Sequence, residues 1–247
     1  MSATTKLTRM EARLFLREPI SLFFGLIFPA LLLYGLGSLF PGFTDPAAEL
    51  NGARFIDVYA PVAIAFGTAM LGLSSLPPTL ATYRQFGILR RLRTTPLHPA
   101  RLLGAQMIVQ GSVAVVSALA VVIVAAVAFD VPLPERALWF VISFLLTAAS
   151  MFTTGLLIGS VTRTNQAAIS IGMATWFPML FFAGLWVPRA MMSSTLQRIA
   201  DFTPLGAGVQ AMSNAWFGSA PTALQIGVMV AYSVIVGLIT VRAFRWE

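Results

Sequence analysis

Residues 101–129 read RLLGAQMIVQGSVAVVSALAVVIVAAVAF, and this stretch decides the fold. After Arg101 it contains no Asp, Glu, Lys or Arg. A helix rises ~1.5 Å per residue, so a run of this length crosses the ~30 Å hydrocarbon core of a bilayer. The sequence therefore predicts an integral membrane protein.

Five similar apolar runs flank this stretch and predict an all-α protein with six transmembrane helices in one domain of residues 1–247. The expected spans are residues 20–40, 57–80, 101–129, 137–160, 166–187 and 222–243. Pro29, Pro61 and Pro178 lie inside spans, where proline kinks a helix and neighbouring helices can repair the lost backbone bond. Gly155 and Gly159 form a Gly-x-x-x-Gly pair, for which packing within one subunit is favoured over a dimer seam.

Composition agrees with a membrane location. Of all residues 57% are hydrophobic and 10% are charged, against about 25% charged in an ordinary soluble domain. The net charge of +7 comes from residues that flank apolar runs, so no basic face for nucleic acid is expected. The chain has no cysteine, which excludes disulfides and thiolate metal sites.

The basic residues predict the orientation. With the N-terminus in the cytoplasm, twelve lie in inner segments and four in outer ones, and the positive-inside rule then favours N-in, C-in. The inner set is Lys6, Arg9, Arg13, Arg17, Arg84, Arg90, Arg91, Arg93, Arg101, Arg163, Arg242 and Arg245, and the outer set is Arg54, Arg136, Arg189 and Arg198.

Residues 3–18 are expected to form an amphipathic helix at the membrane interface. A basic stripe of Lys6, Arg9, Arg13 and Arg17 lies beside an apolar stripe of Leu7, Met10 and Leu14. Such paired stripes suit the interface plane. The alternative is a solvated leader that only sets orientation.

The connection at residues 188–221 is too polar to span the membrane and too apolar to lie free in water. One amphipathic face contains Met191, Met192, Leu196 and Ile199, and another contains Val209, Met212 and Trp216. We expect two short helices, broken at Pro204-Leu205-Gly206, that form a re-entrant hairpin in the outer leaflet. Irregular backbone at that depth must be covered by protein or line a wet cavity.

The densest charge lies in residues 83–97, YRQFGILRRLRTTPL, between the second and third apolar runs. A short basic helix on the cytoplasmic side is a place where a soluble partner could bind. The alternative is a loop that only sets orientation, but orientation alone does not need apolar residues at helical spacing.

The residues needed for ATP hydrolysis, for ion-coupled transport and for hydrolase chemistry are absent from the sequence. The only lysine is Lys6, so no Walker phosphate loop exists, and no carboxylate falls near the centre of an expected span. No paired carboxylates or histidine cluster support a membrane hydrolase. The chain is therefore not expected to be an enzyme by itself, and energy for any transport would come from another chain.

These features resemble the membrane subunit of type-2 ATP-binding-cassette (ABC) exporters, the ABC-2 type permeases, and most of all the daunorubicin-resistance and nodulation-export branch. The resemblance covers essentially the whole chain and includes its size, its six-helix order and its basic leader. Residues 86–97, FGILRRLRTTPL, are similar to the family's Gly-x-Leu-x-x-Leu-x-x-Thr-Pro-Leu signature. Residues 182–188, FAGLWVP, and 199–205, IADFTPL, are similar to its Phe-x-Gly-x-x-x-Pro … Pro-Leu pattern.

The resemblance implies that residues 82–95 form a coupling helix, which docks in a groove of a separate ATPase subunit. The coupling residues carried over are Arg84, Phe86, Gly87, Ile88, Leu89, Arg90, Arg91 and Leu92. The apolar ones would be knobs in that groove, the arginines would pair with acidic groups or lipid phosphate, and Gly87 would allow close backbone approach. Many members have a glutamate just before the glycine; Gln85-Phe86 stand there here, so its salt bridge is not carried over.

The resemblance also implies an assembly of two permease subunits, alike or different, with two ATPase subunits that bind ATP and magnesium, and no cofactor in this chain. The first and fifth helices of each permease would face a central path. The path residues carried over are Phe23, Phe24, Phe28, Phe66, Met70, Trp176, Phe177, Phe181 and Phe182. The alternative is that these side chains face lipid or pack in the core of the subunit.

The resulting prediction is a multi-pass permease of a bacterial plasma membrane that exports a hydrophobic or amphiphilic compound, as in multidrug efflux and antibiotic resistance. Two alternatives stay open. One is export of a lipid-linked polysaccharide by the same architecture, and the other is a non-transporting membrane scaffold or channel.

Overall fold

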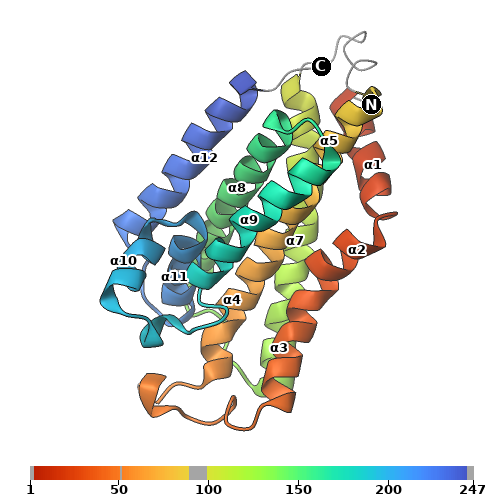
Figure 1. The fold of residues 1–247 in the computed structure, drawn as a ribbon. Helices are drawn as coiled ribbons and strands as arrows, with labels where there is room; N and C mark the ends of the chain where they lie inside the picture. Colours follow the sequence, from red (N-terminus) through yellow and green to blue (C-terminus); the bar gives the residue numbers. More distant parts are fainter. Residues whose placement is uncertain (1–2, 51, 89–98, 244–247) are drawn as a thin grey trace.

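The computed structural model describes residues 3–50, 52–88 and 99–243, which form a helical bundle (Figure 1). Within these ranges there is no strand, and β-pairing is limited to an isolated bridge between Pro46 and Arg54. The predicted all-α class is therefore confirmed. Helix α1 and the C-terminal end of α12 lie at the same end of the bundle (Figure 1).

Five helices of the described chain are long and apolar enough to cross a membrane: Pro19–Leu39, Phe55–Gln85, Arg101–Phe129, Ala137–Val161 and Ala223–Ala243. The first comprises α2 (Pro19–Leu22), a π-helical segment η1 (Phe23–Ile27) and α3 (Phe28–Leu39). The second comprises α4 (Phe55–Ala69), a π-helical segment η3 (Met70–Ser75) and α5 (Leu76–Gln85). The others correspond to α7 (Pro99–Phe129), α8 (Ala137–Val161) and α12 (Ala223–Ala243).

The sixth expected span, residues 166–187, corresponds to the shorter helix α9 (Asn165–Phe182). It is not among the five apolar helices, because Asn165 and Gln166 at its start lower the mean hydropathy of its 18 residues. It ends before the expected limit because Gly184 has φ +91° and its N–H donates to the Phe181 carbonyl. A membrane crossing by α9 therefore stays a prediction.

The first two spans share a distortion that prolines explain. Each contains a π-helical segment that ends two residues before a proline, η1 before Pro29 and η3 before Pro77. Proline cannot donate to the helical ladder, and a π-turn is a common way for a helix to absorb such a break. The second span is also the most buried, with 89% of its most apolar stretch inside the protein against 17% to 61% for the other four.

Glycines let other helices approach η3 closely. A Cβ on Gly25 of η1 would collide with Leu71, and a Cβ on Gly155 of α8 would collide with the Gly72 carbonyl. A Cβ on Gly172 of α9 would likewise meet the Leu73 carbonyl. The Gly155–Gly159 pair thus packs within the subunit, as predicted. The first span, the second span, α8 and α9 all meet at η3.

The N-terminal helix α1 (Ala3–Phe15) differs from the expected interfacial helix in its extent and in its buried face. It ends before Arg17, which therefore does not continue its basic stripe. Met10 and Leu14 are 41% and 40% exposed, whereas Leu7, Glu11 and Phe15 are buried. Of the predicted apolar stripe, Leu7 is thus packed inside while Met10 and Leu14 face outward, and the face that packs on α7 contains a carboxylate at its centre. A position of α1 at the membrane interface stays a prediction.

The connection at residues 188–221 contains two short helices, as predicted: α10 (Ser194–Phe202) and α11 (Pro204–Trp216). They separate at Thr203, and the predicted break at Pro204-Leu205-Gly206 instead forms the first turn of α11. The Thr203 hydroxyl accepts a hydrogen bond from the Gly206 N–H and caps α11. α11 is buried, and its Trp216 is 1% exposed and donates to the Pro132 carbonyl at 2.8 Å. Whether these helices re-enter a membrane stays a prediction.

Candidate functional site

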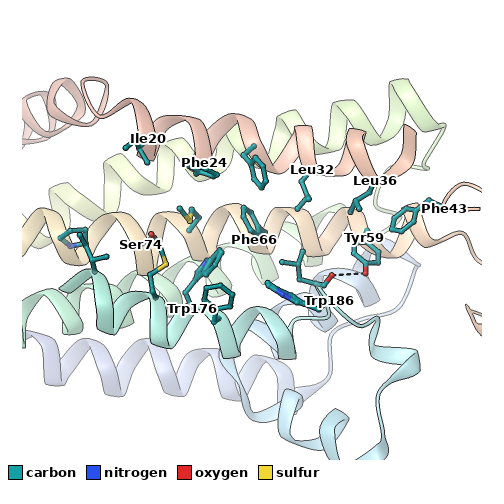
Figure 2. A pocket seen from close by; sticks show the side chains of 17 residues that line it. Ile20, Phe24, Leu32, Leu36, Phe43, Tyr59, Phe66, Ser74, Trp176 and Trp186 are labelled. Carbon is teal, nitrogen blue, oxygen red and sulfur yellow. Dashed lines mark hydrogen bonds between the residues drawn. The ribbon is translucent and has the colours of Figure 1, made fainter. Parts of the chain in front are cut away.

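A cavity of about 880 Å³ lies between the first span, the second span and α9 (Figure 2). The first span contributes Ile20, Phe24, Phe28, Leu32 and Leu36, and the connection after it contributes Phe43. The second span contributes Tyr59, Phe66, Met70, Ser74 and Pro78. The remaining wall consists of Ile169, Met173, Trp176 and Phe177 of α9, followed by Leu185 and Trp186.

Aromatic rings form a continuous chain around this cavity. Phe28 and Phe66 have ring centroids 5.5 Å apart, which joins the first span to the second. Phe66 and Trp176 are 5.6 Å apart, which joins the second span to α9. The chain continues through Phe177 to Trp186, with centroid distances of 5.1 and 5.8 Å. Such edge-to-face and tilted pairs stabilise a wall while leaving large apolar surfaces on the cavity side.

Few polar groups face the cavity. The Tyr59 hydroxyl donates to the Leu185 carbonyl at 3.2 Å, as the dashed line in Figure 2 shows. Ser74 adds a hydroxyl from η3. Trp176 Nε1 is buried and has no hydrogen-bond partner among the described residues. The cavity therefore suits an apolar body with one or two hydrogen-bonding groups better than a heavily hydroxylated molecule.

A smaller pocket of about 240 Å³ adjoins the cavity and shares Pro78 and Ile169 with it. The rest of its lining is mostly polar and comprises Glu18, Ser21, Ser75, Thr79, Thr82, Tyr83 and Asn165. The combined lining thus changes from apolar to polar toward the end of the second span that contains Arg84. This gradient matches an amphiphilic molecule.

The structure places six of the nine predicted path residues in the cavity wall: Phe24, Phe28, Phe66, Met70, Trp176 and Phe177. Phe23 is not in the wall and packs its ring against Phe24 at 5.2 Å. Phe181 and Phe182 are also outside the wall and pack on each other at 5.5 Å.

Sequence reasoning missed other wall residues. Ile169 and Met173 could have been found, because they precede Trp176 and Phe177 on one face of a helix at spacings of three and four. Trp186 could not, because it joins the wall only after α9 has ended.

The second candidate site is the Arg84 end of the second span, where the expected coupling helix begins. α5 stops at Gln85, and Gly87 follows with φ +68° and donates its N–H to the Arg84 carbonyl at 3.0 Å. Nothing lies within 4 Å of a Cβ placed on Gly87. The glycine therefore ends the helix by adopting a left-handed conformation. Close approach of an ATPase subunit to Gly87 stays a prediction.

Arg84 also differs from the expectation. Its guanidinium donates to the carbonyls of Gly159, Ser160 and Thr162 at the C-terminal end of α8, with distances of 3.3 Å to Gly159 and 2.9 Å to Ser160. The last carbonyls of a helix have no partner inside it and carry partial negative charge. Arg84 is therefore an internal cap that ties α5 to α8, rather than a free charge for an acidic group of a partner.

Beside this cap lies a buried carboxylate that the sequence did not reveal. Glu11 is 3% exposed, and its Oε2 accepts hydrogen bonds from the Tyr83 hydroxyl and Gln106 Nε2, both at 2.6 Å. The pKa of Glu11 is raised, mainly because the carboxyl is buried and to a smaller extent because of the nearby charge of Glu18. The hydrogen bonds from Tyr83 and Gln106 lower the pKa but do not cancel this rise. The network ties α1 to α5 and α7.

Of the remaining coupling residues, Phe86 is 70% exposed and Ile88 packs against the core. Leu89, Arg90, Arg91 and Leu92 lie outside the described residues, as does the rest of the expected coupling helix to residue 95. Phe86 is thus a large apolar side chain presented to solvent where α5 ends. Among the described residues, no group of three or more His, Asp or Glu could hold a metal ion.

A family model described as ABC-2 type transporter matches residues 3–217, from α1 through α11. No curated protein matches the chain. The matched segment includes both the cavity wall and the Arg84 end of the second span. A domain of this kind is a membrane transport component rather than a catalytic domain. With most of its length matched, the chain belongs to the ABC-2 type transporter family.

Proposed function

We propose that this chain is the permease subunit of an ATP-driven exporter, which moves a hydrophobic or amphiphilic compound, such as a drug or a lipid-like molecule, out of the cytoplasm. Family membership supports a membrane transport role in general terms. The observation that carries the finer proposal is the cavity of about 880 Å³ between the first span, the second span and α9. Its size lies within the ~300–1,000 Å³ typical of sites for drug-sized ligands.

The wall chemistry supports the substrate class. Aromatic rings and the side chains of Met70 and Met173 form adaptable apolar surfaces that can accept molecules of different shape. The adjoining pocket that contains Glu18 and Asn165 offers polar partners at one end only. A polysaccharide would bring many hydroxyls, each of which loses free energy when buried without a partner. The wall therefore favours an amphiphile over a sugar chain.

The second span connects this cavity to the expected ATPase contact. Met70 and Ser74 of η3 line the cavity, and α5 continues from there to Gln85, directly before Phe86. A push on the exposed Phe86 would thus be transmitted along α5 to the cavity wall. The π-helical segment η3, followed by Pro77, is a place where α5 can tilt relative to α4.

The proposed working unit has two permease subunits and two copies of a separate ABC ATPase subunit, which would bind ATP and magnesium. It would lie in the plasma membrane of a bacterium, with both ends of this chain in the cytoplasm. A non-transporting scaffold or channel would need neither the ATPase nor a tilting second span.

Co-purification with the cognate ATPase subunit tests this proposal, followed by ATP turnover in lipid vesicles with a panel of amphiphilic drugs. We expect a stable complex whose turnover changes with at least one drug. Phe86→Asp should abolish the complex without unfolding the chain, because Phe86 is mostly in solvent. Phe202→Asp is the matched control, since that side chain is 62% exposed on α10, far along the chain from α5.

The possible outcomes separate the parts of the proposal. If the complex is stable but no drug changes its ATP turnover, the assignment as a permease stands and a different class of substrate is favoured. Failure of the wild-type chain to bind any ATPase subunit would contradict the coupling role.

A further inference from the structure

A second apolar groove, of about 360 Å³, lies between α7, α8 and α12. Its wall includes Gly104 and Met107 of α7, Leu156 of α8, and Val234, Gly237 and Leu238 of α12. It shares no residue with the cavity or with the polar pocket beside it. The groove therefore needs an explanation of its own.

The hydroxyl groups in the groove are already satisfied. Thr153 donates to the Ala149 carbonyl at 2.8 Å, and Thr240 donates to the Val236 carbonyl at 2.7 Å. Ser233 does the same to the Met229 carbonyl at 2.8 Å. Because each hydroxyl hydrogen bonds within its own helix, the surface left in the groove suits a hydrocarbon chain.

Two glycines keep the groove open although packing does not require them. A Cβ on Gly104 would meet nothing within 4 Å, and a Cβ on Gly237 would be 3.5 Å from Thr153 Cγ2, an ordinary contact. Alanine would fit at both positions and favours a helix by about 1 kcal/mol over glycine. What the glycines supply is therefore space between the helices.

Two arginines mark one end of the groove. Arg101 is in the first turn of α7, three residues before Gly104, and Arg242 is in the last turn of α12, four residues after Leu238. Residues three or four apart share one face of a helix, so both arginines continue the stripes that line the groove. Both are exposed, and neither has a hydrogen bond or ion pair with any described residue.

We propose that this groove binds an acyl chain of an anionic glycerophospholipid whose phosphate lies against Arg101 and Arg242. The apolar wall accounts for the acyl chain, and the two arginines, which have no partner among the described residues, account for the charge. Arginine near an anionic lipid surface strengthens binding by electrostatic attraction, and its guanidinium matches the geometry of phosphate. The site does not depend on the export function, because it shares no wall residue with the cavity.

Native mass spectrometry of the full chain tests the site, with an equimolar mixture of phosphatidylglycerol and phosphatidylcholine supplied in detergent. We expect the wild type to retain phosphatidylglycerol preferentially. Replacing both arginines, Arg101→Gln with Arg242→Gln, should lower that preference by about fivefold per arginine. Arg163→Gln is the matched control, since Arg163 is an exposed arginine in the turn between α8 and α9.

A second variant separates the acyl chain from the charge. A Cβ on Gly104 meets nothing within 4 Å and Gly104 lines the groove, so Gly104→Leu should fill it and reduce retention of both lipids while the arginines remain. The proposal is overturned if the double arginine variant keeps the wild-type preference, or if Arg163→Gln loses as much. Retention of neither lipid, or a second copy of the chain cross-linked across the groove, would also overturn it.

Discussion

The two ends of the second span are both held by an arginine, but in different ways. At one end, Arg54 pairs with Asp57 at 2.7 Å and donates to the Phe129 carbonyl at the end of α7 at 2.9 Å. At the other end, Arg84 donates to three carbonyls at the end of α8 and pairs with no carboxylate among the described residues. Each arginine therefore binds the C-terminal carbonyls of a neighbouring helix, yet only Arg54 has a charged partner.

The two ends of the second span therefore differ in how their charges are paired. Asp57 raises the pKa of Arg54 through its hydrogen bond, and the pair makes the Arg54 end electrically balanced. At the Arg84 end, a buried carboxylate on Glu11 and a half-buried guanidinium are each held by neutral partners. Uncompensated buried charge is a costly arrangement. The second span thus has one end where the arginine is paired with a carboxylate and one end where it is not, and the unpaired end leads to the segment that is expected to contact an ATPase.

The largest expected effect comes from removing the Arg84 cap. Arg84→Ala would leave the last carbonyls of α8 without these donors and should cost about 2–3 kcal/mol. Arg54→Ala should cost only about 1 kcal/mol, because that side chain is more exposed and Asp57 still accepts a hydrogen bond from the Arg54 backbone N–H. Thermal unfolding in detergent compares the two. A larger loss for Arg54→Ala would reverse the comparison.

A smaller effect is expected from Tyr83→Phe. The change removes the hydroxyl that donates to Glu11 at 2.6 Å and leaves the buried carboxylate with Gln106 as its only described donor. We expect a loss of about 1–2 kcal/mol in thermal or denaturant unfolding. Tyr59→Phe is the matched control, because its hydroxyl donates to a neutral carbonyl and its loss should cost less. Equal losses would show that the charge on Glu11 does not matter.

The pH dependence of stability sharpens the comparison further. The pKa of Glu11 is raised in the folded protein above its ordinary value of 4.5, so folding favours the protonated form. Its favourable contribution is fully present below pH 4.5 and is lost as the pH rises through the folded-state pKa. Glu11→Gln should therefore flatten the fall in melting temperature between acid and neutral pH. Parallel curves for wild type and Glu11→Gln would contradict this assignment.

The smallest stability effect is expected at Gly87. Gly87→Ala must place a Cβ at φ +68°, which costs about 1 kcal/mol. Gly42→Ala, with φ +85° and open space around it, should cost the same. The two variants should differ in ATP turnover of the complex, where only Gly87→Ala is expected to lower the rate. A similar fall for Gly42→Ala would mean that turnover reports stability alone.

Much of the fold follows from composition and periodicity, and the exceptions have physical reasons. The five apolar helices were predictable because long uncharged runs have few alternatives to crossing a membrane. Phe28, Phe66 and Trp176, which the family resemblance had suggested for a substrate path, lie together in the cavity wall, and their role in a path stays a prediction. Glu11 was not predictable as a buried group, because a carboxylate on the packed face contradicts the usual pattern and needs Tyr83 and Gln106 from distant segments.

The role of Arg84 was hidden for a similar reason. Its neighbours in sequence suggest a basic segment for a partner, whereas its three carbonyl partners lie more than seventy residues away on α8. The end of α9 was missed because apolar residues continue past Phe182, and only the left-handed Gly184 stops the helix.

The central claim is that the cavity between the first span, the second span and α9 binds the transported compound. Its most direct test is drug-stimulated ATP turnover of the complex in lipid vesicles with Met70→Trp, which would fill the cavity from η3. Leu145→Trp, on the exposed face of α8, is the control. We predict that Met70→Trp still forms the complex but loses stimulation while Leu145→Trp keeps it. Wild-type stimulation in a folded Met70→Trp complex would contradict the account.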